Sequence, residues 1–126
     1  MPDKDGGESL HAARILVVED EAIVAMDVQF TLEDAGAEVV GPARTLTDAK
    51  HLAEHEDISA AILDLRLGRE SAGAVARVLT QRGIPFVFYT GQTAADPLRA
   101  EWPDAPLLQK PATTRELVQA IAQLLK

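Results

Sequence analysis

Three carboxylates in the sequence directly follow short apolar runs that are typical of buried β-strands. Asp64 follows the run Ala60–Leu63, and Glu19 and Asp20 follow the run Arg14–Val18. In an open α/β sheet, ligands bind beyond the carboxyl ends of the strands, so acids at these positions could form a site. Taken alone, Asp64 is better explained as a turn residue or a helix N-cap. Its interpretation therefore depends on the residues that end the other strands.

Two further apolar runs end in a hydroxyl and an amine. Ile84–Tyr89 is followed by Thr90, and Pro106–Gln109 is followed by Lys110. If all four runs are neighbouring parallel strands, the acids, the hydroxyl and the amine converge at one edge of the sheet. Such a combination favours a functional site over a set of unrelated turn residues.

Together these groups could carry out phosphoryl transfer. Carboxylates that lie close together repel one another unless a cation lies among them. Mg²⁺ (or Mn²⁺) fits, because it binds few protein oxygens and shares its remaining positions with phosphate. Asp64 could then act as the nucleophile that forms an aspartyl phosphate. Lys110 would pair with Asp64 before transfer and with a phosphoryl oxygen afterwards, and Thr90 would donate a hydrogen bond to another oxygen.

Hydrophobic periodicity predicts helices between the strands, which gives an α/β fold. The second strand is Glu38–Gly41. In the first helix, Ile23, Met26 and Phe30 share one apolar face, with Val24, Val28 and Leu32 beside it. We expect a five-stranded parallel sheet of order 2-1-3-4-5, doubly wound and flavodoxin-like, with helices on both faces. The predicted helices are residues 22–35, about 45–56, 72–81, and a last helix that begins at the capping box of residues 113–116. Residues 93–102 are weakly helical and interrupted by Pro97, so we expect only a short helix there.

Composition and charge limit the classes of function. The chain has 126 residues, no cysteine, a formal net charge of −8 and a sequence pI of about 4.7. We expect a flexible N-terminal tail over residues 1–13 and one domain over residues 14–126. The acidic charge and the lack of a basic cluster argue against nucleic-acid binding. No apolar run is long enough to span a membrane, so we expect a soluble, cytoplasmic protein.

Four short motifs resemble, in order, the motif regions of a response-regulator receiver domain, which is the phosphoacceptor module of bacterial two-component signalling. They are ILVVEDE at residues 15–21, ILDL at 62–65, FYTG at 88–91 and QKP at 109–111. The resemblance covers about residues 14–126. Each motif is weak alone, but the ordered combination is highly specific.

This resemblance implies a role for each candidate residue. Asp64 would be the phosphoacceptor, Asp20 a direct Mg²⁺ ligand and Glu19 a water-mediated ligand. The backbone carbonyl of Arg66 would complete the protein's share of the metal coordination. The resemblance also implies a cis peptide bond before Pro111, although X-Pro bonds in folded proteins are cis in only about 5–6% of cases.

The sequence departs from the usual receiver pattern at two strands and one loop. Leu107 stands where most receiver domains have an aromatic residue that moves together with the threonine of the site. The loop after Asp64 reads LRLGRES and lacks the common proline. These features, with GIPFVFYTG at residues 83–91, resemble the FAT GUY subclass of mostly single-domain regulators, which pair with histidine kinases of the HWE and related types. Tyr89 replaces the alanine that is usual in that subclass.

We therefore expect a single-domain response regulator that accepts a phosphoryl group from a sensor histidine kinase. It would relay the signal by protein–protein interaction or act as a phosphate sink, with a homodimer as one option and no turnover of small molecules. Two alternatives stay open: an interaction module with a receiver fold that is not phosphorylated, and a receiver fragment of a hybrid histidine kinase. A phosphatase of the dehalogenase type would need a second acid two residues beyond Asp64, where Arg66 stands.

Overall fold

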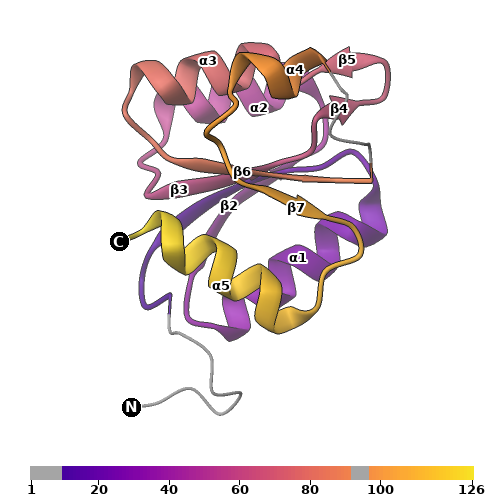
Figure 1. Cartoon of the computed structure of the whole chain (residues 1–126). Coiled ribbons are helices and arrows are strands. Elements are labelled where there is room, and N and C mark those ends of the chain that lie inside the picture. The colour runs from indigo at the N-terminus through magenta and orange to yellow at the C-terminus, as the bar shows by residue number, and fades with distance from the viewer. Residues whose placement is uncertain (1–9, 92–96) are drawn as a thin grey trace.

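The computed structural model describes residues 10–91 and 97–126, which form alternating strands and helices (Figure 1). The main strands are β1 (Arg14–Val18), β2 (Glu38–Ala43), β3 (Ala60–Leu63), β6 (Phe86–Thr90) and β7 (Leu107–Gln109). A small hairpin consists of β4 (Arg66–Leu67) and β5 (Glu70–Ser71). The helices are α1 (Ala22–Asp34), α2 (Leu46–His55), α3 (Gly73–Gln81), α4 (Pro97–Glu101) and α5 (Thr114–Leu124).

The main sheet has the strand order β2-β1-β3-β6-β7, and all of its strand pairs are parallel. This order confirms the predicted 2-1-3-4-5 arrangement and the flavodoxin-like fold. The helices α1 and α5 cover one face of the sheet, whereas α2, α3 and α4 cover the other (Figure 1). Parallel strands that are connected by helices bring all of their carboxyl ends to one edge of the sheet.

The central strand β3 is apolar throughout because helices cover it on both faces. Ala61 and Leu63 belong to the core beneath α2, α3 and α4, and Ala60 and Ile62 belong to the core beneath α1 and α5. Successive side chains of a strand point to opposite faces, so a strand between two helical layers needs apolar residues at every position. This requirement explains the unbroken apolar run that precedes Asp64.

The predicted apolar face of α1 is correct for Val28 and Leu32 but wrong for Ile23, Met26 and Phe30. Ile23, Met26 and Phe30 are 83%, 52% and 61% exposed, and the helix instead buries a stripe of Ala25, Val28 and Leu32. Both sets of residues have helical spacing, so periodicity could not distinguish the face that meets the sheet. We call Ile23, Met26 and Phe30 the α1 stripe.

Residues 10–13 belong to the folded domain, although the sequence placed them in a flexible tail. Leu10 is almost fully buried in the core beneath α1 and α5. The backbone N–H groups of Leu10 and Ala12 donate hydrogen bonds to the carbonyls of Ala35 and Gly36, each over 2.9 Å. This segment therefore packs against the end of α1 before it enters β1.

Three further boundaries differ from the prediction. Strand β2 continues to Ala43 through a cis Gly41–Pro42 bond, with a register shift where it pairs with β1. The hairpin β4–β5 forms in the loop after Asp64, where no strand was expected. Pro97 begins the short helix α4 rather than interrupting it, as its missing N–H allows at a first helical position. The first part of the segment predicted to contain this helix, residues 93–96, lies outside the described residues.

None of the described helices combines the length and the apolar character that a membrane crossing requires.

Candidate functional site

A hollow of about 330 Å³ lies at the carboxyl edge of the sheet, where β1, β3, β6 and β7 end. Its walls come from segments that are far apart in the sequence. The residues that line it are Asp20, Glu21, Asp64, Arg66, Gly68, Thr90, Gly91 and Lys110. Five of the six candidate residues therefore line the hollow. The sixth, Glu19, contacts Lys110 at the buried side of the site.

The Lys110 ammonium joins the two buried acids of the site. Its Nζ lies 2.8 Å from Oδ2 of Asp64 and 2.6 Å from Oε1 of Glu19, with Oε1 of Glu21 at 3.5 Å. The side chains of Lys110, Glu19 and Asp64 are 13%, 3% and 9% exposed. A charged hydrogen bond in such a sheltered position is stronger and shorter than one at the surface.

Four carboxylates lie close to one another at this site. Glu19, Asp20, Glu21 and Asp64 each offer an oxygen, and these oxygens all lie within 4.8 Å of one another. Burial raises the pKa of Glu19 to about 7, and the nearby charge of Asp64 adds to the increase, although the hydrogen bonds from Lys110 and from the Glu21 backbone oppose it. Carboxylates so close together repel one another, so the cluster favours an additional cation.

Lys110 remains protonated at any pH at which the protein functions. Burial by itself would lower the pKa of Lys110, but the hydrogen bonds and charges of Asp64 and Glu19 raise it well above its ordinary value. The ammonium is therefore a fixed positive charge beside the Asp64 carboxylate.

Backbone contacts fix the positions of the two aspartates. The N–H of Gly68 in the β4–β5 turn donates to Oδ2 of Asp20 over 2.7 Å, and the N–H of Arg66 donates to Oδ1 of Asp64 over 3.4 Å. The Arg44 guanidinium donates to the backbone carbonyl of Asp20 through Nε and Nη2, over 3.2 and 3.1 Å. Sequence reasoning did not find Arg44 or Gly68, because neither belongs to a motif: Gly68 uses its backbone N–H, and the Arg44 side chain contacts only the backbone carbonyl of Asp20.

Thr90 ends β6 at the floor of the hollow and is fully buried. Its carbonyl accepts a hydrogen bond of 2.9 Å from the N–H of Lys110, so the two residues are held side by side across β6 and β7. A side chain at Gly91 would meet no atom within 4 Å, which leaves space beside Thr90. The bond between Lys110 and Pro111 is cis, as the resemblance implied.

The donor set of the site suits Mg²⁺. Carboxylate and carbonyl oxygens are the ligands that this hard ion prefers, and it commonly binds through one or two carboxylates and retains several waters. Asp20, Glu19 and Asp64 supply the acids, and Arg66 lines the same hollow. In the described residues these acids form the only cluster of three or more carboxylate or imidazole groups with metal-binding spacing.

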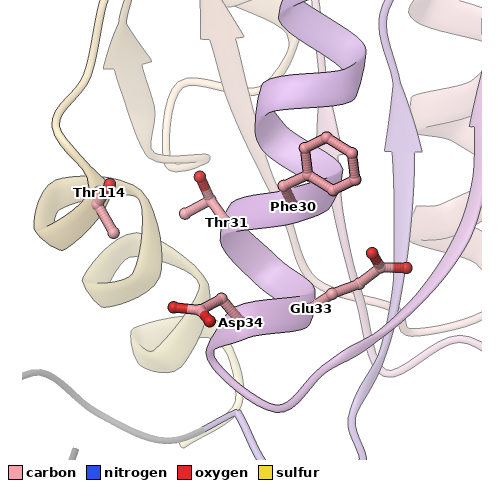
Figure 2. A pocket seen from close by; sticks show the side chains of 5 residues that line it. All are labelled: Phe30, Thr31, Glu33, Asp34 and Thr114. Atoms are coloured by element: carbon pink, nitrogen blue, oxygen red, sulfur yellow. The ribbon is translucent and has the colours of Figure 1, made fainter. Parts of the chain in front are cut away.

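A second pocket, of about 450 Å³, lies between α1 and α5, away from this site (Figure 2). Figure 2 shows Thr31 and Asp34 on the side of α1 that faces Thr114 of α5, with Phe30 and Glu33 farther around the helix. Its lining holds no lysine, arginine, histidine or buried acid. We therefore assign the chemistry to the hollow around Asp64.

The fold and the site define a flavodoxin-like protein with an acidic, lysine-containing site at the carboxyl edge of its sheet. A family model described as "Response regulator receiver domain" matches residues 15–122. The chain belongs to this family.

Individual relatives support the same assignment. The phyllosphere-induced regulator PhyR of Methylorubrum extorquens is 35% identical over 118 residues, which are 90% of this chain and 44% of PhyR. The transcriptional regulatory protein PdtaR of Mycobacterium tuberculosis is 32% identical, over 86% of this chain and 54% of PdtaR. The chain thus spans about half the length of the curated relatives it matches. The solution structure of SdrG from Sphingomonas melonis Fr1 is 40% identical with a TM-score of 0.79, over 91% of this chain and 98% of SdrG.

Magnesium is expected to stabilise the folded protein, because an ion among these carboxylates relieves their repulsion. A ligand that binds only the folded state adds about 2.7 kcal/mol when its concentration is about one hundred times its dissociation constant. For a domain of this size, that gain corresponds to a rise in melting temperature of about 10 °C. Thermal unfolding with and without Mg²⁺ measures the shift.

The variants Asp20→Asn and Asp27→Asn test whether the stabilisation comes from this site. Asp20 lies in the hollow, whereas Asp27 is an exposed acid on α1. We expect Asp20→Asn to lose most of the magnesium-dependent rise and Asp27→Asn to keep it. An equal rise in both variants would place the ion elsewhere.

Proposed function

We propose that this chain is a single-domain response regulator that accepts a phosphoryl group from the phosphohistidine of a sensor histidine kinase. Asp64 is the acceptor, and Thr90 and Lys110 assist it. Asp20, Asp64 and the backbone carbonyl of Arg66 would hold Mg²⁺ directly, and Glu19 would hold it through water. The observation that carries this proposal is the Lys110 ammonium, 2.8 Å from the Asp64 carboxylate in an acidic hollow.

The chemistry follows from the positions of these groups. An oxygen of Asp64 attacks the phosphorus while the phosphorus–nitrogen bond to the donor imidazole breaks, and the electron pair of that bond stays on the imidazole. When bound, Mg²⁺ neutralises charge on the phosphoryl oxygens. Lys110 turns from Asp64 to one phosphoryl oxygen, and the hydroxyl of Thr90 donates a hydrogen bond to another. The open space beside Gly91 leaves room for the phosphoryl group.

We further propose that the α1 stripe binds a helix of the kinase. Glu21 lines the hollow, and the stripe begins two residues later at Ile23, so a donor that reaches Asp64 also lies over α1. Exposed apolar residues three and four positions apart form the kind of surface that packs against another amphipathic helix. The pocket in Figure 2 continues this surface, because Phe30 belongs to both.

The variants Met26→Ser and Phe30→Ser are expected to slow phosphotransfer from the kinase. An apolar anchor at the centre of an interface contributes about 2 kcal/mol, so each substitution should reduce the transfer rate by about thirtyfold. Phosphorylation by the small donor acetyl phosphate should be unchanged, because it needs no docking surface. The measurement follows labelled phosphate from an autophosphorylated HWE-type histidine kinase to each variant.

Leu125→Ser is the matched control for this experiment, since Leu125 is an exposed leucine at the end of α5, outside the α1 stripe. It should accept phosphate from the kinase at the wild-type rate. If the kinase phosphorylates Met26→Ser and Phe30→Ser as fast as the wild type, the α1 stripe is not its docking surface.

The remaining parts of the proposal concern how the chain works in the cell. A kinase of the HWE type is proposed as the donor, on the strength of the features that resemble the FAT GUY subclass. The match to nearly the whole length of SdrG supports a regulator made of one receiver domain. Such a protein passes its signal to a partner protein or drains phosphate from its kinase. We propose that it acts in the cytoplasm, as a monomer or homodimer, and that it turns over no small molecule.

A further inference from the structure

Tyr89 occupies a position from which it can organise the site without lining it. It lies in β6 directly before Thr90, is only 5% exposed, and packs in the core beneath α1 and α5. Thr90 faces the hollow, so the preceding residue points to the other face of the sheet. Across the strand pair, Tyr89 is in register with Leu108 of β7, two residues before Lys110.

The Tyr89 side chain contacts the segment that carries Lys110 at two points. Its hydroxyl oxygen accepts a hydrogen bond of 3.2 Å from the backbone N–H of Ala112. The Lys110 Nζ lies 5.7 Å from the centre of the Tyr89 ring, within the range of a cation–π interaction. One side chain thus holds both the backbone beyond Lys110 and the ammonium itself.

These contacts matter because Lys110 has a long, flexible side chain. Its ammonium must stay within 2.8 Å of both Glu19 and Asp64, and four rotatable bonds separate it from the backbone. The aromatic ring attracts the ammonium and keeps it at the site. The hydroxyl holds the backbone of the segment that leads into α5. Ala112 comes just before the N-cap of α5, Thr113, so this bond also fixes where the helix begins.

We propose that Tyr89 is a positioning residue for Lys110. Its ring and its hydroxyl hold the ammonium between Glu19 and Asp64, and so set the rate at which Asp64 is phosphorylated. This inference rests on the proposed function, because it assigns Tyr89 a role through Lys110 in that reaction.

Two substitutions separate the contributions of the hydroxyl and the ring. Tyr89→Phe removes the acceptor for the Ala112 N–H but keeps the ring beneath Lys110, and it should slow phosphorylation by acetyl phosphate and Mg²⁺ by up to about tenfold. Tyr89→Leu removes the ring as well and should slow the reaction by up to about thirtyfold more. Phe86→Leu is the control, because Phe86 is a buried aromatic residue of the same strand that packs in the opposite core. It should lower the melting temperature and leave the rate unchanged.

The decisive comparison repeats Tyr89→Phe and Tyr89→Leu in the background of Lys110→Met. If Tyr89 acts through Lys110, these substitutions have no further effect on the rate once the ammonium is gone. An equal slowing in both backgrounds, or wild-type rates for both Tyr89 variants, would overturn the inference and leave the proposed function intact. A wild-type protein that takes up no phosphate would instead refute the proposed function, and the inference with it.

Discussion

The Asp64→Asn variant is expected to keep its unmodified mass after incubation with acetyl phosphate and Mg²⁺, whereas the wild type gains one phosphoryl group. An asparagine amide has no carboxylate oxygen with which to attack phosphorus, so no acyl phosphate can form at this position. The side chain has nearly the same shape, and its loss of charge removes the repulsion between residue 64 and the neighbouring acids Glu19, Asp20 and Glu21. The variant should therefore fold, and intact-mass spectrometry reads the difference directly.

Asp57→Asn serves as the control, because Asp57 is an exposed aspartate in the turn before β3 and does not line the hollow. It should gain the same phosphoryl group as the wild type. Phosphorylation of Asp64→Asn at the wild-type level would show that another residue is the acceptor, and the roles proposed for Lys110 and Thr90 would then lose their basis.

The Lys110→Met variant is expected to be phosphorylated about a hundredfold to a thousandfold more slowly than the wild type. The ammonium is the fixed positive charge of the site, and removing one charged donor from a developing anion typically has an effect of this size. The variant also leaves Glu19 buried without its partner, so its free energy of unfolding should fall by about 3 kcal/mol. The phosphorylation rate and the melting temperature measure these two effects.

Lys50→Met is a matched substitution at an exposed lysine of α2, and it should change neither quantity. If Lys110→Met reacts as fast as Lys50→Met, then Lys110 serves only to neutralise buried acids. A slow rate without a loss of stability would instead mean that Glu19 is protonated in the variant, because the variant lacks the Lys110 hydrogen bond and charge that lower the pKa of Glu19.

The main features of the fold could be predicted because the buried strands leave a clear pattern. β3 and β6 lie between two helical layers, so the sequence reads as unbroken apolar runs that end in Asp64 and Thr90. The expected order of the sheet is that of the common flavodoxin-like arrangement, which the rules for connected parallel strands allow but do not fix. The convergence of acids, hydroxyl and amine follows from that order, because each group stands at the end of its strand.

Features that depend on tertiary contacts could not be predicted. α1 has apolar residues on two faces, and only the position of the sheet decides that Val28 is buried and Phe30 exposed. Leu10 is a single apolar residue in a polar segment, so its burial against the end of α1 leaves no periodic signal. The β4–β5 hairpin has two residues in each strand, which is too short for alternation to be visible.

The residues that carry the chemistry of the site could be predicted, but the contacts that hold them in position could not. The Arg44 guanidinium binds the backbone carbonyl of Asp20, and the backbone N–H of Gly68 binds its carboxylate; neither contact belongs to a sequence motif. Tyr89 was visible only as a departure from a subclass pattern, and its contacts with Lys110 and Ala112 depend on the register of β6 and β7. Such supporting contacts are typically invisible in a sequence because they join elements across the fold.

The central claim is that Asp64 receives the phosphoryl group. Borohydride reduces an acyl phosphate to an alcohol, so the acceptor aspartate becomes homoserine and can be located by sequencing peptides of the wild-type protein after treatment with acetyl phosphate and Mg²⁺. We predict homoserine at position 64 and at no other aspartate, and none when the metal is removed with a chelator. Homoserine at a different aspartate, or the same yield at position 64 without magnesium, would contradict the account.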